Sequence, residues 1–384
     1  MSRKIRILHI ISGLETGGAE RALYNLLSGG LAERTDSHVV SLGDGGTIGP
    51  QIEALGIPVT SLGIRGLGTL MSGSILLRQV VRNMRPWIIQ GWMYHGNLAA
   101  TYARSVAPSK PLLVWNIRQS LYEIGREKQM TQHVIRANKI SSSAPDVLLY
   151  NSLVSRNQHE LLGFASARGQ VIPNGINVDR FSFSVDSRQL VRRELGITED
   201  SPVVGHMARF HPMKDHARFL RLAGELAIRH PDIHFVLGGK GISLQNTELI
   251  QSVPVNVRNR FHFLGERRDV SELMSAMDIF CLSSAWGEGF PNVIGEAMAV
   301  GVPCVVTDVG DSALVVGEAG IVVPPQDEGS FSAAIERLLT MPPDDYRVLS
   351  VRARSRIENN YTLDKIVDLY EALYSELNAA RGTI

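Results

Sequence analysis

Two carboxylates, Glu288 and Glu296, stand eight positions apart with a Gly-Phe-Pro-Asn turn (289–292) after the first. The apolar run 279–284 before them is typical of a buried strand, and 294–300 is typical of the start of a helix. The N–H groups in the first turn of a helix lack internal partners. Carboxylates can hold hydroxyl groups and free amides can hold an anion, which together suit a sugar joined to a nucleoside diphosphate. The alternative is a helix start whose acids only suit the helix dipole.

Two cations follow an earlier apolar run, 203–207: Arg209 comes first and Lys214 five residues later. An Arg side chain can clamp a phosphate with two bonds, and a Lys adds a point charge. We expect the pair to neutralise a departing diphosphate, although a solvated surface pair is the plain alternative. The chain has no Asp-x-Asp pattern, in which close carboxylates commonly hold a divalent ion. We therefore predict chemistry that requires no metal and no other cofactor.

A glycine-rich loop, 13–20, joins the first predicted strand to the first predicted helix and contains Gly17 and Gly18. Glycines let the backbone approach a ligand, and a helix N-terminus favours a phosphate. The spacing lacks the dinucleotide-binding G-x-G-x-x-G pattern. His95 and Arg118 each follow another predicted strand. Both are candidates to contact a sugar or an acceptor, and a structural role for His95 is equally open.

Short strands and helices alternate along the chain, and the alternation starts again in the second half. Helices are predicted over 19–31 and 75–84, and strands over 5–11, 38–42, 87–90, 112–117, 147–150, 203–207, 234–237, 261–264, 279–282, 304–306 and 321–323. This pattern predicts an α/β protein with two Rossmann-like doubly wound domains facing a cleft. We expect domains at 1–173 and 174–361, with a helix over 362–384 that packs back on the first domain. Ligands of such sheets bind beyond the carboxyl ends of the strands, where each polar motif falls.

Composition describes a globular enzyme, because 44% of the 384 residues are hydrophobic and 20% are charged. No apolar run reaches the roughly 18 residues that span a bilayer. The first residues lead directly into a strand, so we read no signal peptide and expect a cytoplasmic protein. The two cysteines, Cys281 and Cys304, lie in apolar runs and are expected to be reduced core residues.

Charge is unevenly distributed. Residues 1–172 hold 18 Lys and Arg against 10 Asp and Glu, a net +8, and the remaining residues carry a net −7. The segment 67–85, which includes the predicted helix 75–84, combines apolar residues with Arg78, Arg82 and Arg85. A second basic run contains Arg126, Lys128, Arg136 and Lys139. These residues suit contact with an anionic membrane and a lipid-linked acceptor. The alternative is a core-facing helix with solvated arginines. No nucleic-acid partner is expected.

The motifs together resemble family 4 of the retaining glycosyltransferases, which have the GT-B architecture, and the resemblance covers nearly the whole chain. The segment 288–296 matches the family's E-x7-E motif, and 8–21 resembles its opening loop. The segment 171–177 resembles the interdomain linker, and 263–270 resembles the stretch beside the donor base. Similar bacterial enzymes build polysaccharides and lipid-linked glycans.

The resemblance implies roles for individual residues. Arg209 and Lys214 would bind the diphosphate, Glu296 the ribose and Glu288 the transferred sugar. His95 would lie near that sugar. Further donor contacts would come from main-chain groups and side chains of Gly17, Gly18, Gly265, Arg267, Gly289, Phe290, Asn292 and Val293.

The acceptor side would involve Glu15 and Arg118. Many relatives carry His where this chain has Arg118 with Gln119, which obscures that assignment. Many also have a Gly-Arg pair where Ala208 precedes Arg209, a smaller departure.

The reaction implied is transfer of a sugar, as by a hexosyltransferase, from a UDP- or GDP-sugar to an acceptor hydroxyl with retained anomeric configuration. The acceptor would be a lipid-linked or polysaccharide precursor of the cell envelope. Positive charge at the leaving diphosphate would be the main catalytic term, and no carboxylate nucleophile can be assigned. Two alternatives stay open: a nucleotide-sugar 2-epimerase of the same fold, and a non-catalytic nucleotide-sugar-binding module.

Overall fold

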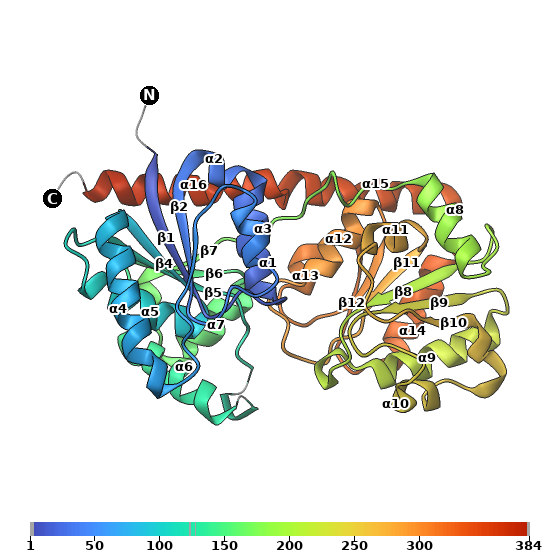
Figure 1. Ribbon diagram of the computed structural model, residues 1–384. Helices are drawn as coiled ribbons and strands as arrows, with labels where there is room; N and C mark the ends of the chain where they lie inside the picture. The colour runs from blue at the N-terminus through green and yellow to red at the C-terminus, as the bar shows by residue number, and fades with distance from the viewer. Residues whose placement is uncertain (1–3, 123, 127, 382–384) are drawn as a thin grey trace. The chain divides into compact units, whose positions relative to one another are not determined.

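A computed structural model describes residues 4–122, 124–126 and 128–381, without the side chains of residues 67, 126, 380 and 381. The chain forms two compact units (Figure 1). Unit 1 comprises Met1–Gly175 and Leu363–Ile384, and unit 2 comprises Ile176–Thr362. Each unit is an α/β structure built on one parallel sheet, which confirms the predicted fold class.

The sheet of unit 1 has seven parallel strands in the order β3-β2-β1-β4-β5-β6-β7. Its strands are β1 Ile5–Ile11, β2 Thr35–Ser41, β3 Val59–Ser61, β4 Ile88–Trp92, β5 Leu112–Ile117, β6 Val147–Tyr150 and β7 Gly169–Val171. Its helices are α1 Gly18–Leu26, η1 Leu27–Leu31, α2 Ala32–Arg34, α3 Gly49–Glu53, α4 Leu67–Met84, α5 Met93–Ser105, η2 Ile124–Arg126, α6 Gln129–Ser141, α7 Leu153–Leu162, η3 Ser166–Arg168 and α16 Leu363–Arg381.

The sheet of unit 2 has six strands in the order β10-β9-β8-β11-β12-β13. They are β8 Val203–Met207, β9 His234–Gly238, β10 Phe261–Phe263, β11 Ile279–Leu282, β12 Cys304–Thr307 and β13 Gly320–Val323. The helices are α8 Val185–Glu194, η4 Pro212–Lys214, α9 His216–Arg229, α10 Thr247–Gln251, η5 Val255–Arg260, α11 Val270–Ser275, α12 Asn292–Val300, α13 Ser312–Val316, α14 Glu328–Leu339 and α15 Pro343–Asn360.

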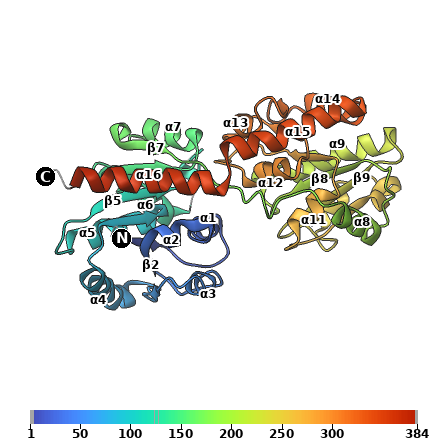
Figure 2. The same cartoon turned by 90° about the horizontal axis from the view of Figure 1, so that it is seen from above.

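Helices cover both faces of each sheet (Figure 2), so each unit has two hydrophobic clusters. Strands buried on both faces carry continuous apolar sequence, which is why the runs for β1, β5, β6, β8 and β11 could be read from the chain. Strand order reverses at the first strand of each unit, between β1 and β4 and between β8 and β11. Such a reversal opens a crevice beyond the carboxyl ends of the two strands.

Several elements differ from the prediction: β2 begins at Thr35 and not at residue 38, and β4 covers Ile88–Trp92 and not 87–90. The single helix expected over 19–31 is broken at Gly29 and Gly30, because Gly30 adopts a φ of 110° and η1 follows α1 as a π-helical turn. The helix predicted over 75–84 begins at residue 67. Strand β3 was not predicted, because its three residues are partly exposed and carry no apolar run.

The last helix, α16, packs on unit 1 (Figure 2). Its buried face includes Tyr370 and Tyr374, which join the same cluster as residues of β1 and α1. The Tyr374 hydroxyl donates to Gln90 Oε1 at 2.5 Å. On the exposed side Arg34 pairs with Asp368 at 2.6 Å. The helix therefore contributes to the core of unit 1.

None of the helices described here is long and apolar enough to span a membrane. Cys281 and Cys304 are buried free thiols, as the sequence predicted. Burial raises the pKa of both thiols, which keeps them protonated.

A buried histidine makes the stability of unit 1 depend on pH. His9 in β1 is fully buried, and its Nδ1 accepts a 3.3 Å hydrogen bond from Trp92 Nε1. Burial lowers the pKa of His9 from 6.5 to about 3. Because the unfolded chain then binds a proton that the native state excludes, stability is full above about pH 6.5 and falls as the pH drops toward 3.

We expect His9 to cost about 2 kcal/mol of stability between pH 7 and pH 5. Urea denaturation of His9→Gln should show a pH dependence smaller by that amount than in the parent protein. The matched control is His133→Gln, because His133 is exposed in α6 and should leave the dependence unchanged. An equal pH dependence in parent and His9→Gln would contradict the assignment.

Candidate active site

The strand-order reversal of unit 2 gathers several of the predicted residues. Arg209 and Lys214 follow β8, and Glu288 follows β11, its neighbour in the sheet. The loops after both strands leave from the same edge. Chain segments about 75 residues apart thus meet where a doubly wound sheet binds its ligand.

Glu288 and Lys214 form a buried ion pair. The Glu288 carboxylate is 7% exposed, and its Oε1 accepts hydrogen bonds from both Lys214 Nζ and Ser284 Oγ. Among the described residues, Oε2 accepts no hydrogen bond. The carboxylate is therefore held by one oxygen, and the other can accept from a ligand hydroxyl.

Further hydrogen bonds hold the two chain segments that carry this ion pair. Ser283 Oγ donates to Lys214 O at 2.9 Å and lies 3.1 Å from His206 Nε2. Burial holds the pKa of His206 well below its ordinary value, so this histidine is neutral. Because the Ser283 hydroxyl hydrogen is used for Lys214 O, the bond to His206 requires the tautomer whose Nε2 donates to Ser283 Oγ. Thr307 Oγ1 donates to Ser284 O at 2.6 Å. The motifs did not reveal these residues; their one signal is a pair of small hydroxyls directly after β11.

The turn after Glu288 is packed closely. Gly310, at φ 62°, approaches the Glu288 carbonyl so closely that a Cβ would overlap it. Phe290 is buried edge-on against Tyr361, with ring centres 5.4 Å apart, so only its main chain can meet a ligand. The amide of Asp311 donates to Gly289 O at 2.9 Å. These contacts fix the backbone of the turn.

Helix α12 starts at Asn292, two residues earlier than predicted, with Pro291 as its N-cap and no capping side chain. Asn292 and Val293 therefore occupy the first positions of the helix, whose amides lack helical partners. Glu296 lies on the fifth residue of α12 and is partly buried.

Arg209 differs from Lys214 in being exposed. It makes no hydrogen bond or ion pair with any residue that the structure describes. Its charge nevertheless affects a neighbouring histidine. Burial lowers the pKa of His211, and the positive charges of Arg209 and Lys214 lower it further. The loop after β8 thus carries positive potential and one uncommitted guanidinium.

Arg267, predicted as a donor contact, is occupied. Its guanidinium pairs with Glu194 at 2.8 Å and with Asp269 at 2.5 Å, and these bonds raise its pKa. Gly265 adopts a φ of 68°, and its carbonyl accepts from the amide of Gly239 at 2.7 Å. This hydrogen bond joins the backbones of the loops after β9 and β10. Arg267 takes no part in the Lys214–Glu288 ion pair.

In unit 1 the strand reversal lies between β1 and β4. Gly18 begins α1 directly after the N-cap Gly17, and open space surrounds the position that a Cβ of Gly18 would take. The Glu20 carboxylate lies against Gly17, and burial raises its pKa. Glu15 is exposed. Of the two glycines predicted to contact a phosphate, Gly18 is exposed and Gly17 is partly buried beside the Glu20 carboxylate.

His95 lies on the first turn of α5, directly beyond β4, and is exposed. Partial burial of its ring lowers its pKa, so the neutral form dominates at pH 7. The turn before it is strained, because Met93 adopts a φ of 62°. The Asn97 amide nitrogen donates to Gly91 O at 3.0 Å and to Met93 O at 3.3 Å.

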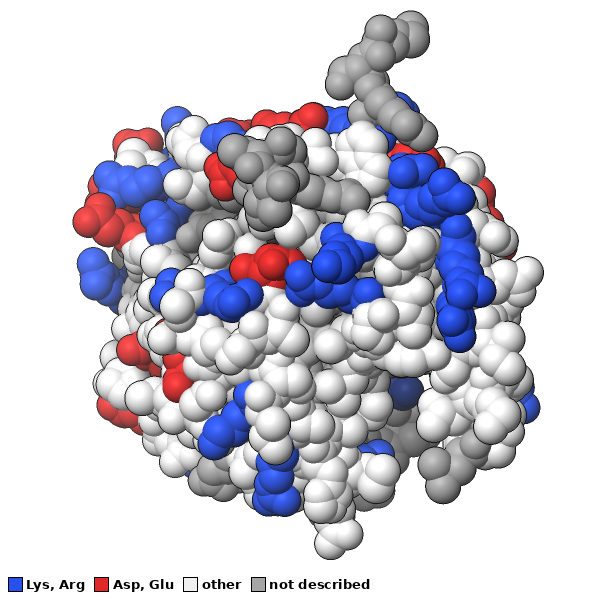
Figure 3. Space-filling model, turned by 90° about the vertical axis from the view of Figure 1, so that its left-hand side faces the viewer, with Lys and Arg blue, Asp and Glu red and all other residues white. Residues whose placement is uncertain are grey.

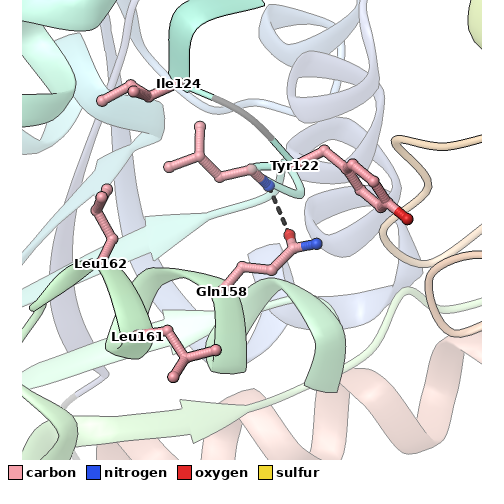
Figure 4. A pocket seen from close by; sticks show the side chains of 6 residues that line it. Tyr122, Ile124, Gln158, Leu161 and Leu162 are labelled. Carbon is pink, nitrogen blue, oxygen red and sulfur yellow. Dashed lines mark hydrogen bonds between the residues drawn. The ribbon is translucent and has the colours of Figure 1, made fainter.

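Beside the loop after β5 is a hollow of about 310 Å³ (Figure 4). Its walls are mostly apolar, and Leu121 N donates to Gln158 Oε1 across it at 2.7 Å. The lining residues are Leu121, Tyr122, Ile124, Gln158, Leu161 and Leu162. In the described part of the chain, no three His, Cys, Asp or Glu side chains gather as metal ligands.

Family models match most of this architecture. Residues 16–180 match the model described as Glycosyltransferase Family 4, and residues 201–341 match Glycosyl transferases group 1. The chain belongs to glycosyltransferase family 4. The two matches fall on the two units, and they include the loops that carry His95, Lys214 and Glu288.

Two curated relatives illustrate the range of proteins to which the chain is similar. The chain is 30% identical over 213 residues to UDP-Gal:alpha-D-GlcNAc-diphosphoundecaprenol alpha-1,3-galactosyltransferase of Escherichia coli, covering 54% of each chain. It is 27% identical over 260 residues to GDP-mannose-dependent monoacylated alpha-(1-6)-phosphatidylinositol monomannoside mannosyltransferase of Corynebacterium glutamicum, covering 64% of this chain and 61% of that one. The matched regions thus span less than two thirds of these relatives.

Among solved structures, the fold is similar to Anabaena HepE in complex with UDP, with a TM-score of 0.84 and 22% identity. The match covers 97% of this chain and 100% of that chain. The same Anabaena protein has also been solved with UDP-glucose. At this identity the likeness establishes the two-domain GT-B fold alone.

Proposed function

We propose that this family member is a retaining glycosyltransferase that moves a sugar from a UDP- or GDP-sugar to an acceptor hydroxyl. The observation that carries the proposal is the buried Lys214–Glu288 pair beside the exposed Arg209, at the strand reversal of unit 2. A carboxylate oxygen suited to a sugar hydroxyl there adjoins positive charge suited to a diphosphate.

In the proposed reaction, the bond between the anomeric carbon and the diphosphate oxygen breaks while the acceptor oxygen bonds the same carbon from the same face. The acceptor proton passes to the leaving phosphate oxygen. Arg209 and Lys214 stabilise the negative charge that develops on the diphosphate, and preorganised charge of this kind is a major source of rate enhancement. Glu288 Oε2 accepts from a hydroxyl of the sugar, and Glu296 holds the ribose. This scheme requires neither a protein nucleophile nor a metal.

An epimerase of the same fold would also bind a nucleotide sugar. The two activities separate when the protein is incubated with the donor alone. An epimerase changes the sugar configuration without an acceptor, whereas a transferase only releases nucleoside diphosphate slowly. A binding module would do neither.

Donor choice is tested by thermal denaturation with a panel of UDP- and GDP-sugars. Because a ligand that binds only the native state stabilises it by mass action, a donor at about 100 times its Kd adds about 2.7 kcal/mol. We expect one nucleotide to stand out and the shift to be the same with and without EDTA. A shift that EDTA abolishes would overturn the metal-free scheme, and no shift with any donor would overturn the proposal as a whole.

We also propose a lipid-linked acceptor in cell-envelope glycan synthesis. Support comes from the two relatives, whose names specify a diphosphoundecaprenol-linked and a phosphatidylinositol-based substrate. Enzymes with such acceptors work at a membrane surface, so a surface of this chain should suit anionic lipid.

Helix α4 provides such a surface. Met71, Ile75, Arg78 and Arg82 recur at intervals of three or four residues and form one exposed stripe along the helix. Arg85, the C-cap residue, is exposed at the end of the helix. The apolar pair is 76% and 63% exposed. The opposite face is buried and consists of Gly73, Leu77, Val80 and Val81. The stripe is therefore not core-facing, and its apolar half begins where α4 leaves the carboxyl edge of the sheet.

The surroundings of α4 are also basic. Residues 54–122 contain seven Lys and Arg and no Asp or Glu. Figure 3 shows the side on which α4 lies in Figure 1, with more blue than red and broad uncharged areas between. Lys128, Arg136 and Lys139 add cations on and beside α6, while the side chain of Arg126 lies outside the described part. Apolar insertion next to cations suits peripheral binding to anionic lipid.

Co-sedimentation with phosphatidylglycerol-rich vesicles at low salt tests this surface. We expect binding that is lost with pure phosphatidylcholine, and a drop of about 30-fold in Arg78→Gln/Arg82→Gln, since each arginine contributes about 1 kcal/mol. Met71→Gln/Ile75→Gln should weaken it as well. Arg347→Gln/Arg352→Gln is the control, because those exposed arginines lie on α15 in unit 2. Equal binding by all variants would exclude α4 as the contact.

A further inference from the structure

Arg118, directly after β5, is bonded to three side chains at the carboxyl edge of the unit 1 sheet. One terminal nitrogen donates to Tyr370 hydroxyl at 3.1 Å and to Asn116 Oδ1 at 3.4 Å. The other donates to Asn174 Oδ1. The guanidinium lies over the ring of Trp92, 5.4 Å from its centre. This side chain is thus anchored from several directions.

Two of these partners lie where the chain leaves and re-enters unit 1. Asn174, which is 8% exposed, is the residue before Gly175, the last of the outgoing segment. Tyr370 is 1% exposed and lies in α16, the returning segment. Its hydroxyl also accepts from Asn116 Nδ2 at 2.9 Å. One guanidinium therefore fastens both segments to the end of β5.

The two segments also touch each other. A Cβ at Gly175 would lie 2.8 Å from Leu363 Cα, closer than packing allows. The bonds from Arg118 would hold this close pair in one position on the sheet edge. Hydrogen bonds to a charged group are stronger than those between neutral groups, so losing them should free the segments measurably.

We infer that Arg118 is a positioning residue, which fixes the outgoing segment at Asn174 and the returning helix at Tyr370 to the carboxyl edge of the unit 1 sheet. This role differs from the acceptor contact implied by the family resemblance, and it holds whatever the donor and acceptor are. Asn116 and Trp92 also contact the Arg118 guanidinium.

Hydrogen exchange of the full chain, without ligand, tests the inference. In Arg118→Met we expect amides of residues 172–176 and 363–370 to exchange about tenfold faster or more, with β1 and β4 unchanged. Tyr370→Phe removes one partner with little loss of packing and should accelerate the same segments. Tyr374→Phe is the matched control: it also loses a buried hydroxyl bond in α16, to Gln90, but not one to Arg118.

A conservative rescue separates positioning from simple packing. Asn174→Asp keeps an oxygen acceptor for Arg118 and should exchange within about twofold of the parent, whereas Asn174→Leu should behave like Arg118→Met. The Kd for UDP should be the same in all variants. Three outcomes would each overturn the inference. They are unchanged exchange in Arg118→Met, acceleration spread evenly over unit 1, and a loss of UDP affinity confined to Arg118→Met. Since exchange is measured without donor, these outcomes are independent of the proposed transferase activity.

Discussion

Glu288→Gln should lower the rate of sugar transfer by about 10²- to 10³-fold while the protein stays folded. The amide can still accept from Lys214 and Ser284 through its oxygen, which preserves the shape of the site. Its NH2 group, however, replaces the free Oε2 and cannot accept from a sugar hydroxyl. The measurement is kcat with the donor that gives the largest thermal shift.

The structure changes which variant is informative. Glu288→Ala, the obvious choice from sequence, would leave the Lys214 ammonium, only 13% exposed, without its partner. Breaking a buried ion pair from one side costs about 3–5 kcal/mol, so lost activity could reflect unfolding. Glu318→Gln, at an exposed position of unit 2, controls for the loss of one carboxylate. Normal turnover by Glu288→Gln would refute the role of this residue.

Arg209→Gln should reduce kcat by about 10²-fold, because it removes one cation from the developing diphosphate charge. Its effect on stability should stay within about 0.5 kcal/mol, since Arg209 is exposed and bonds no described residue. Steady-state kinetics and thermal denaturation of the same preparation check both statements.

The control for Arg209 is Arg352→Gln, which removes an exposed arginine of α15 in the same unit. We expect parent-like rates from it. A parent-like rate in Arg209→Gln too would place the diphosphate elsewhere. A large loss of stability in that variant would instead mean that Arg209 has a structural role.

The fold could be predicted from sequence to the extent that burial dictates residue type. Strands β1, β5, β6, β8 and β11 are buried almost throughout, and their bounds agree with the apolar runs. Strand β3 and the break at Gly30 could not be read, because one is half exposed and the other depends on a single backbone angle. Local pattern does not determine either feature.

For the site, the sequence indicated which residues could carry the chemistry but not which of them form ion pairs with one another. Lys214 and Glu288 were both proposed from motifs, yet their ion pair joins segments 74 positions apart. Ser284 and His206 were missed, since hydroxyls after strands and buried histidines are common. Arg267 was nominated as a donor contact, and only the fold reveals Glu194, 73 positions away, on its guanidinium. Whether a charged side chain is already satisfied is a tertiary property.

Because α16 completes the core of unit 1, this unit is assembled from both ends of the described chain. During synthesis, residues 1–175 leave the ribosome before the 187 residues from Ile176 to Thr362. The apolar residues of β1 and α1 therefore lack their packing partners Ile366, Val367 and Tyr374 until α16 has been made. At about 5–20 residues per second the delay is roughly 10–40 s. During that interval the nascent domain exposes an apolar face that the mature molecule never shows. Molecular chaperones that recognise exposed apolar surface should bind the nascent chain at this stage and release it once α16 packs on unit 1.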